Sequence, residues 1–324
     1  DPKLPGWHHV PDVPIQVSPL FSWPPRPSAL LRWIWGGWIP LTVQLIIAGL
    51  AFISFVWFQP PLTETRTLAP GWIAEMYLRN LVLMASVAGG LHLYFYTFTK
   101  QGKTLRYDPR PLMKNGKQFT LGGQIRDNMF WTLASGVPIW TAYETLMFWA
   151  MANGYAPMIT WAAHPIWFIA LFFLIPIWES FYFYWIHRLL HIPFLYKHVH
   201  ALHHRNINVG PWSGLSMHPV EHVIYLGTVL IHLIVAAHPV HILFHLQYYA
   251  LTAATTHTGF EGLLIKDENR LKLGTFHHQM HHRYFECNYG SLEIPWDKLF
   301  GSFHDGTQAS HEKISERRKR MAQQ

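Results

Sequence analysis

Charged side chains are scarce in this sequence: Asp, Glu, Lys and Arg make up only 13% of its 324 residues. They are absent from four stretches, which are residues 33–63, 80–99, 128–143 and 145–178. A helix that crosses a bilayer needs about 20 mostly apolar residues, so each stretch can hold or contribute to a transmembrane helix. A cleaved signal peptide would not explain four of them. The composition therefore predicts an integral membrane protein.

Cysteine is almost absent. Because Cys287 is the only one, this chain alone cannot build an internal disulfide, a zinc finger or an iron–sulfur cluster. The sequence also lacks a nucleotide-binding glycine motif and a fused haem domain, so any redox chemistry would need a separate electron donor. The net charge of +7 arises in short loops beside the apolar stretches, where it indicates membrane orientation rather than nucleic-acid binding.

The order of apolar and basic segments predicts a topology. We expect transmembrane helices at about 38–58, 78–98, 128–151 and 161–185. By the positive-inside rule the basic loop Lys100–Arg126 faces the cytoplasm, and it is either a topology determinant alone or also a docking site for an acidic electron donor. Residues 223–260 carry no charged side chain but are split by Pro239, so we expect a re-entrant hairpin that returns to the cytoplasmic side.

Histidines recur at short, ordered spacings in the second half of the chain. The three boxes are His187-x-x-x-His191, His200-x-x-His203-His204 and His278-x-x-His281-His282. Positions i, i+3 and i+4 share one helix face, so each box can aim its imidazoles at one point. Neutral imidazoles suit iron or zinc. A polar run at a membrane surface or an adventitious metal-binding tract is the alternative, but three boxes in order favour a metal site.

Two acidic residues fall within the apolar segments, where a charge is costly and marks a functional candidate. Glu144 is either functional or pairs with another helix through a polar contact. Glu179 lies two helical turns before His187, and we expect it to accept a ring N–H from a ligand histidine and so fix its tautomer. The aromatic run 181–184 either lines a substrate route from the bilayer or packs against lipid and protein.

The boxes, followed by Asn288-Tyr289-Gly290 and Trp296-Asp297, resemble the fatty acid hydroxylase/sterol desaturase superfamily over roughly residues 125–305. The doubled form HHxxHHxxxxxNYG and the element His218-Pro219 look closer to sterol C5-desaturase (lathosterol oxidase) and sterol C4-methyl oxidase relatives than to plain fatty acyl hydroxylases. His257-Thr258-Gly259 resembles the family's intervening element, which supplies a further ligand. The N-terminal third of the chain matches this family weakly.

Some residues near the boxes go beyond the family pattern. Glu221-His222 departs from the sterol C5-desaturase sequence, so His222 is either an added ligand or a group that supports one. The same question applies to further residues, namely His198, His218, His277, Glu179 and Glu221.

Together with the apolar stretches, the resemblance implies an all-α membrane protein. It would have about four transmembrane helices, a re-entrant helical hairpin and a cytoplasmic helical cap that holds a histidine-rich dimetal site. We expect a proline-rich N-terminal arm (1–32), a transmembrane hairpin with its basic loop (33–124), a catalytic domain (125–305) and a charged C-terminal tail (306–324).

The resemblance also implies a chemistry: two iron ions, or zinc in the isolated protein, with dioxygen as co-substrate. The implied ligands are His187, His191, His200, His203, His204, His257, His278, His281 and His282. Such a centre would hydroxylate or desaturate an unactivated C–H bond of a lipid, sterol-like or fatty acyl substrate. Its two electrons would come from cytochrome b5, a ferredoxin or a reductase. The active site would lie on the cytoplasmic side of a bacterial inner membrane or of the endoplasmic reticulum.

Two other functional classes stay open on the sequence. A membrane metal-binding or transport protein without oxygenase activity would also use histidines, although usually along the spans, whereas here they gather at one end. An inactive scaffold descended from an enzyme would predict damaged boxes, and these boxes are complete.

Overall fold

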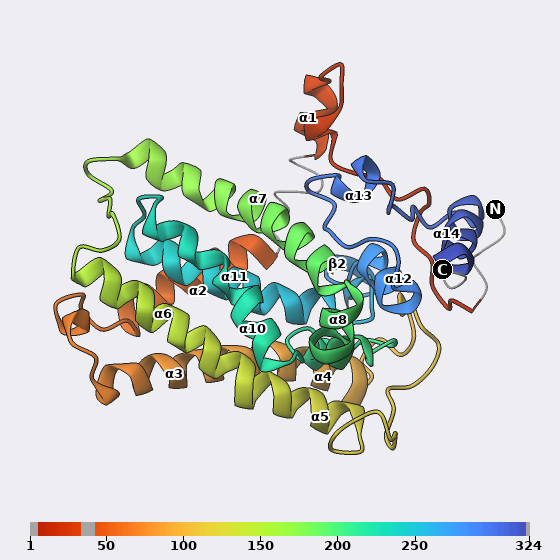
Figure 1. The fold of residues 1–324 in the computed structure, drawn as a ribbon, viewed down its shortest axis with the longest axis horizontal. Coiled ribbons are helices and arrows are strands. Elements are labelled where there is room, and N and C mark those ends of the chain that lie inside the picture. Colours follow the sequence, from red (N-terminus) through yellow and green to blue (C-terminus); the bar gives the residue numbers. More distant parts are fainter. Residues whose placement is uncertain (1–5, 34–42, 322–324) are drawn as a thin grey trace.

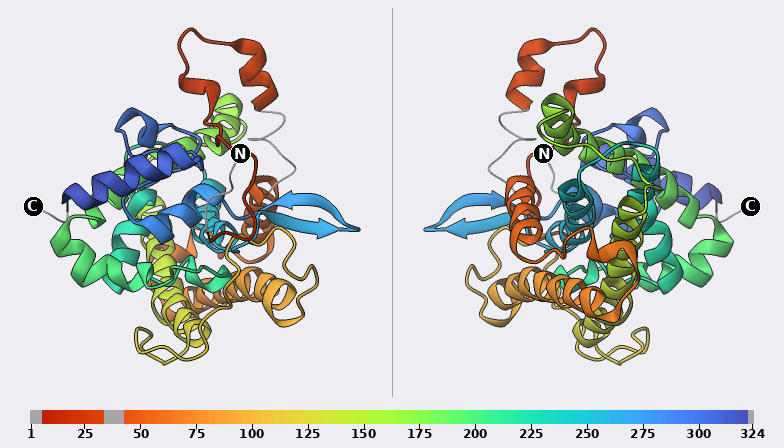
Figure 2. Two further views of the ribbon diagram at one scale, coloured as in Figure 1. Left: turned by 90° about the vertical axis from the view of Figure 1, so that its right-hand side faces the viewer. Right: turned by 90° about the vertical axis from the view of Figure 1, so that its left-hand side faces the viewer.

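The computed structural model describes residues 6–33 and 43–321, and most of it is helical (Figure 1). The prediction of an all-α fold is wrong in one respect, because β1 (Gly262–Ile265) and β2 (Glu268–Lys272) form an antiparallel hairpin, which projects from the helices in Figure 2. Lys266 and Asp267 join the strands with φ angles of 53° and 62°. Two central residues with positive φ give the twist that a two-residue hairpin turn needs. Asn-Gly, the usual sequence signal of such a turn, is absent here.

Helices occupy all four segments that were expected to cross the membrane. They are α2 (Val43–Trp57), α3–α4 (Pro70–Met84 and Gly90–His92), α5–α6 (Gln124–Trp131 and Val137–Ala152) and α7 (Pro165–Leu190). The π-helical turns Ala85–Gly89 and Thr132–Gly136 join the split pairs, and Leu93–Thr97 extends α4. By length and composition, Pro70–Thr97 and Pro165–Leu190 can cross a membrane. For the other two segments a crossing stays a prediction, and residues 38–42 lie outside the described residues.

Residues 219–256 form two helical arms, divided where Pro239 predicts. The first arm is α10 (Pro219–Leu226) with its 3-10 continuation Gly227–Leu233, and the second is α11 (Pro239–Thr256), which has Pro239 in its first turn. α11 packs against α2, α6 and α7 and is buried at most of its positions (Figure 1). A helix that is apolar on all sides belongs in a core, so α11 is the centre of the bundle. The depth of these arms in a bilayer stays a prediction.

Short elements gather at one end of the bundle, around the histidine boxes (Figure 1). They are α8 (Pro193–Leu195), α9 (Ala201–His204), α12 (Phe276–Tyr284), α13 (Trp296–Leu299) and α14 (Gln308–Met321). The N-terminal arm, which includes α1 (Pro27–Trp33), reaches this end: the indole of Trp7 lies edge-on to the rings of Phe276 and Tyr284, with centroids 4.9 and 6.3 Å apart. The arm therefore helps to cover α12.

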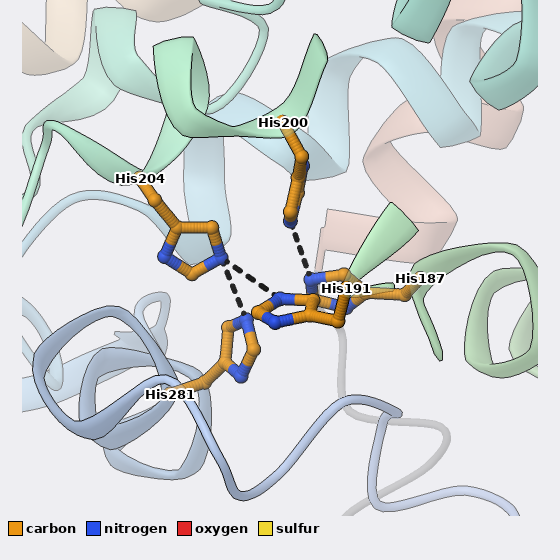
Figure 3. A group of neighbouring side chains, drawn as sticks. All are labelled: His187, His191, His200, His204 and His281. Carbon is orange, nitrogen blue, oxygen red and sulfur yellow. Dashed lines mark hydrogen bonds between the residues drawn. The ribbon is translucent and has the colours of Figure 1, made fainter. Parts of the chain in front are cut away.

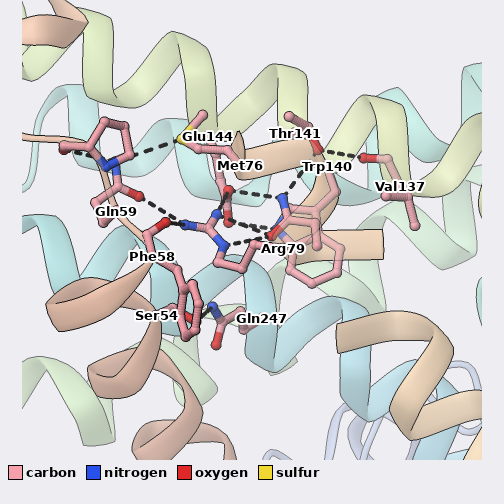
Figure 4. A network of polar contacts seen from close by, with 12 residues as sticks. Ser54, Phe58, Gln59, Met76, Arg79, Val137, Trp140, Thr141, Glu144 and Gln247 are labelled. Carbon is pink, nitrogen blue, oxygen red and sulfur yellow. Dashed lines mark hydrogen bonds and ion pairs between the residues drawn. The ribbon is translucent and has the colours of Figure 1, made fainter. Parts of the chain in front are cut away.

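A buried ion pair joins α3 to α6 (Figure 4). The guanidinium of Arg79 contacts the Glu144 carboxylate, which also accepts hydrogen bonds from Asn80 Nδ2 at 2.9 Å and Trp140 Nε1 at 2.8 Å. Glu144 is 0% exposed and Arg79 is 7% exposed. The polar-contact interpretation of Glu144 is thus the one that the geometry supports. The helix begins at Pro70, eight residues before the expected start, with the proline in its first turn, where its missing N–H costs nothing.

We predict that Glu144→Leu destabilises the protein by about 3–5 kcal/mol, because the buried guanidinium of Arg79 would lose its counter-charge. The double variant Arg79→Met/Glu144→Leu removes both charges and should recover most of that loss. Thermal unfolding in detergent measures both effects. Glu75→Ala, at an exposed position of the same helix, is the matched control. A double variant as unstable as Glu144→Leu would show that the pair itself is not what the single substitution disturbs.

Candidate metal centre

The nine histidines of the predicted ligand set converge in the fold and form two groups. The first group is His187, His191, His200, His204 and His281, and the second is His203, His257, His278 and His282. Within each group the potential ligand nitrogens lie within 4.8 Å of one another. Figure 3 shows the first group, in which imidazoles from three separate segments point toward a common centre. Eight of the nine side chains are buried, and His191 is half-buried.

Helix geometry explains how the boxes divide between the groups. The i, i+4 pair His200 and His204 belongs to the first group, whereas His203 is turned by about 100° from its neighbour and reaches the second. The third box does the converse, since His278 and His282 enter the second group and His281 enters the first. The expectation that each box aims at one point is therefore wrong for these two boxes. Each of them contributes to both groups.

Hydrogen bonds at Nδ1 fix the direction of several rings. Nδ1 of His187 lies 2.6 Å from the carbonyl oxygen of Tyr289, Nδ1 of His281 lies 2.6 Å from that of Cys287, and Nδ1 of His257 lies 2.7 Å from that of Ala253. A carbonyl oxygen can only accept, so each Nδ1 carries the hydrogen. In a neutral imidazole the other nitrogen, Nε2, then presents a lone pair toward the centre of its group.

The contacts between Nε2 atoms are those of a metal site. Nε2 of His187 and Nε2 of His200 are 3.1 Å apart, although Nδ1 of His200 is itself engaged with Glu221 at 2.7 Å. Two lone pairs that face each other at this distance repel unless a cation lies between them. Nitrogens bound to one transition-metal ion at about 2.0–2.1 Å stand about 3.0–3.4 Å apart. In the second group, Nε2 of His257 is 3.1 Å from Nε2 of both His278 and His282. The donor set fits a metal in both groups.

The loop 287–290 orients two proposed ligands, His187 of the first box and His281 of the third. Residues 287–290 supply the carbonyl oxygens that accept from His281 and His187, and the Asp297 carboxylate holds this loop by accepting from the backbone N–H of Tyr289 at 2.9 Å and of Gly290 at 2.8 Å. A Cβ at Gly290 would lie 3.1–3.2 Å from Tyr184 and Asp297, so a side chain there would disturb the contact. The Asn-Tyr-Gly and Trp-Asp elements thus act on the histidines through the backbone.

The carboxylate that supports a candidate ligand is Glu221. It is 1% exposed, and its Oε1 accepts from Nδ1 of His200. We expected this role for Glu179, and that expectation is wrong: among the described residues neither oxygen of Glu179 has a hydrogen-bond partner. The ring of His245, which is outside both groups, lies nearby, with Nε2 3.5 Å from Oε1. Sequence spacing placed Glu179 on the same helix face as His187, but the Nδ1–H of His187 is already donated to the carbonyl oxygen of Tyr289.

The remaining candidates lie outside the two groups. His222 uses both ring nitrogens elsewhere, with Nδ1 3.0 Å from the Ser135 hydroxyl and Nε2 2.9 Å from the Leu215 carbonyl oxygen. His218 caps α10 by accepting from the N–H of Val220, and His198 is exposed. His277 is buried, with Nε2 3.8 Å from the Asp297 carboxylate. None of these four has a position from which it joins the nine.

Burial keeps the imidazoles uncharged. It lowers the pKa of His200 to about 3 and that of His203 to about 4. Burial is also the largest cause for His281 and His282, whose pKa values lie well below the ordinary value and are lowered further by neighbouring imidazoles. Metals bind the neutral form, so protons do not compete with a metal at neutral pH.

A cavity of about 210 Å³ adjoins both groups. His187, His200, His203, His257 and His278 line one end. Along α7 the lining extends back to Pro176, and Tyr248, Tyr249 and Leu292 form much of the rest. The cavity gives an apolar ligand access to the point between the histidine groups.

Residues 171–302 match the family described as fatty acid hydroxylase, and this segment contains all nine histidines, Glu221 and Asp297. The matched segment is less than half of the chain, and over this segment the chain resembles the fatty acid hydroxylase family. The match begins in α7, so it covers the predicted 125–305 domain from residue 171 to residue 302, with all of the candidate ligands.

Several curated sterol desaturases and a lathosterol oxidase resemble parts of the chain. A Delta(7)-sterol 5(6)-desaturase of Gibberella zeae is 35% identical over 121 residues, which are 37% of each chain. Lathosterol oxidase of Rattus norvegicus is 34% identical over 122 residues, 37% of this chain and 40% of the relative. A putative Delta(7)-sterol-C5(6)-desaturase of Arabidopsis thaliana is 25% identical over 240 residues, 70% of this chain and 80% of the relative. The chain thus spans well under half of the fungal and rat relatives. No solved structure matches it.

We predict that the protein reconstituted with Fe²⁺ under anaerobic conditions retains two ions per chain. His281→Ala and His282→Ala each remove one nitrogen, the former from the first group and the latter from the second, so each should lower the stoichiometry toward one. Elemental analysis after gel filtration measures it. His198→Ala, an exposed histidine between the first two boxes, should keep two ions. Two ions retained in both box variants would contradict the division into groups.

We predict that Glu221→Ala weakens metal binding by about 10–100-fold, the usual cost of removing a group that orients a ligand histidine. Glu221→Gln keeps an oxygen acceptor for His200 and should lose much less. Competition with a metal chelator measures the affinity. Glu293→Ala, another carboxyl on the cavity wall, is the matched control. Equal affinities for the Glu221→Ala and Glu293→Ala variants would exclude the orienting role.

Proposed function

We propose that this chain is an integral membrane oxygenase with two non-haem metal ions, natively iron, that oxidises an unactivated C–H bond of a lipid. It would use dioxygen and two electrons, and its product would be an alcohol or an alkene. The observation that carries the proposal is the pair of histidine groups, whose ring nitrogens face each other at the end of an apolar cavity. The names of the relatives, which are sterol desaturases and an oxidase, support the same class of reaction.

The nine histidines are the proposed ligands: His187, His191, His200, His204 and His281 for one ion, and His203, His257, His278 and His282 for the other. Bound iron would supply the oxygen chemistry that side chains cannot perform. All-nitrogen sets of this kind suit iron as well as zinc, so zinc in isolated protein would not exclude native iron.

The protein's part in the reaction is to position the ligand rings and the substrate and to exclude water. The carbonyl oxygens of Tyr289, Cys287 and Ala253 hold hydrogens on Nδ1 of three proposed ligands, which keeps Nε2 free for the metal through the whole cycle. Glu221 does the same for His200. The apolar cavity wall orients a C–H bond of the substrate toward the histidines and keeps bulk water from the site, as a reactive centre requires.

Metal transport is the alternative from another class. A transported ion needs a series of sites that bind and release it along a path. The candidate ligands here form two adjoining groups, and backbone acceptors fix several of their rings. Rings held in this way suit a resident metal, which favours the oxygenase.

We further propose that the electron donor is a separate protein, such as cytochrome b5, a ferredoxin or a reductase, which docks at the cytoplasmic side. The basic loop between α4 and α5 approaches the histidine end. Arg205, next to His204, donates to the carbonyl oxygen of Gln118 and the hydroxyl of Thr120, and Tyr107 donates its backbone N–H to the carbonyl oxygen of Gly259. The loop's lysines Lys114 and Lys117 are at the surface and complement an acidic donor. The membrane would be a bacterial inner membrane or the endoplasmic reticulum.

We predict that membranes with the iron-loaded protein, an electron-donor system and a sterol or fatty acyl lipid form an oxidised product that depends on dioxygen. His203→Ala should abolish turnover, because it removes a ligand from the four-histidine group. Lipid mass spectrometry under ¹⁸O₂ measures the product, and label is retained in an alcohol but not in an alkene. His198→Ala is the matched control and should keep full activity. Full activity in the His203→Ala variant would refute the ligand role of His203.

A further inference from the structure

The cavity contains polar groups at a distance from the histidines, and the proposed chemistry does not use them. Glu179 lines the cavity wall, is 3% exposed, and has no hydrogen-bond partner at either oxygen among the described residues. Tyr249, on the facing helix α11, also lines the cavity and is 5% exposed, and within the part of the chain that the structure describes its hydroxyl has no hydrogen-bond partner. Buried polar atoms without partners cost free energy, so they indicate a ligand that completes their hydrogen bonds.

The hydrogen bonds around Glu179 indicate its protonation state. His232 places Nδ1 3.4 Å from the Val235 carbonyl oxygen, and its Nε2 therefore accepts from Nδ1 of His245 at 3.0 Å. Nε2 of His245 is then an acceptor, and the hydroxyl of Thr228 lies 3.2 Å from it. Nε2 of His245 therefore carries no hydrogen that it could donate to Glu179. A buried carboxylate without a cation or a donor is unfavourable, so Glu179 is a neutral acid with one donor and one acceptor.

The charge of the cavity wall limits the chemical class of the ligand further. No lysine or arginine is among the described residues that line it, whereas three glutamates are: Glu179, Glu221 and Glu293. Beside Glu179, two helical turns from the proposed metal ligand His187, a phosphate, a sulfate or an ionised carboxylate would therefore meet no cationic side chain of the lining. A neutral hydroxyl fits, because it can accept from the acid and donate to it or to the Tyr249 oxygen.

We infer that Glu179 and Tyr249 form a subsite that binds the hydroxyl group of a lipid alcohol within the substrate cavity. The subsite specifies the substrate of the proposed oxygenase. The inference rests on that proposed function for its assumption that this cavity holds the substrate. Stacking holds the phenol of Tyr249 in place, since its ring lies 3.9 Å from that of Tyr225 at an interplanar angle of 7°. The rest of the lining is mainly apolar and aromatic, which suits the hydrocarbon part of the ligand.

The position of the subsite has a consequence for which carbon is oxidised. Glu179, Phe183 and His187 are spaced by four residues, so they share one face of α7 and all line the cavity. Eight residues correspond to about 12 Å along a helix. The carbon that reaches the histidines is therefore remote from the hydroxyl oxygen, not adjacent to it.

The test is equilibrium binding of matched probe pairs to the detergent-solubilised, metal-loaded protein without dioxygen or reductant. One pair is cholestanol with cholestane, and the other is octadecanol with octadecane. Each pair differs only in the hydroxyl. We expect wild-type protein to prefer the alcohol of one pair by about tenfold or more, the usual worth of satisfying buried polar groups. The pair that shows the preference identifies the source of the alcohol, a sterol or a straight chain.

Variants assign the preference to Glu179. Glu179→Leu should remove it and leave hydrocarbon binding unchanged, whereas Glu179→Gln, which keeps a donor and an acceptor, should retain most of it. Glu293→Gln is the matched control and should bind as wild type. Two-ion metal content in each variant verifies folding. The inference is overturned if neither alcohol is preferred, if Glu179→Leu weakens alcohol and hydrocarbon alike, or if only Glu293→Gln removes the preference.

The assay separates this inference from the proposed function, because it needs no turnover. If wild-type protein oxidises lipid normally but shows no preference for either alcohol, the subsite alone is refuted. If wild-type protein prefers an alcohol but forms no oxidised product, the oxygenase proposal alone is refuted. Where turnover occurs, mass spectrometry of the product should find oxidation far from the hydroxyl. Oxidation at a carbon next to the hydroxyl-bearing carbon would contradict the position of the subsite.

Discussion

The direction of the imidazole nitrogens is the constraint on which the rest of this structure depends. A histidine can bind a metal through either nitrogen, and nine free side chains could adopt many combinations. Here the backbone carbonyl oxygens of Tyr289, Cys287 and Ala253 take the hydrogens of three rings, and Glu221 takes that of a fourth. The remaining nitrogens turn inward. The two groups are therefore arranged before any ion binds, and the cost of ordering them is part of folding.

The fold can be understood as the means of bringing these acceptors to the rings. α7 carries His187 and His191 at the end of a long apolar helix, and α11 ends beside His257 after crossing the centre of the bundle. The buried Arg79–Glu144 pair and its hydrogen bonds tie α3 to α6 around this core. The loop 287–290, held by Asp297, then closes over the histidines. Packing of the apolar helices against one another therefore brings segments that are distant in the sequence together around the histidines.

Much of this could be predicted from the sequence, and the reason is spacing. The boxes, the helices and the break at Pro239 depend on local periodicity, which a sequence displays directly. The division of the second and third boxes could also have been found, since His203 and His281 lie out of line with their i, i+4 neighbours on a helix. We predicted that all the imidazoles of a box point to one place, because positions i+3 and i+4 were treated as lying on the same line of the helix surface.

Other features depend on contacts between distant segments and gave no local signal. Glu179 and Glu221 are both acids near histidines in the sequence, but only the packing of α10 against the second box shows which one meets a ring. The carbonyl oxygen of Cys287 could not be recognised as an acceptor, because every residue has one. Lys266-Asp267 is an uncommon pair for a tight hairpin turn, and the strands beside it are short.

The central claim is that inward-facing imidazole nitrogens from all three boxes bind two metal ions. X-ray absorption spectroscopy of the iron-loaded, purified protein tests it most directly. The account predicts a first shell dominated by nitrogen, with the multiple scattering typical of several imidazoles for each of two irons. A shell dominated by oxygen from water or carboxylates, or iron without imidazole scattering, would contradict it.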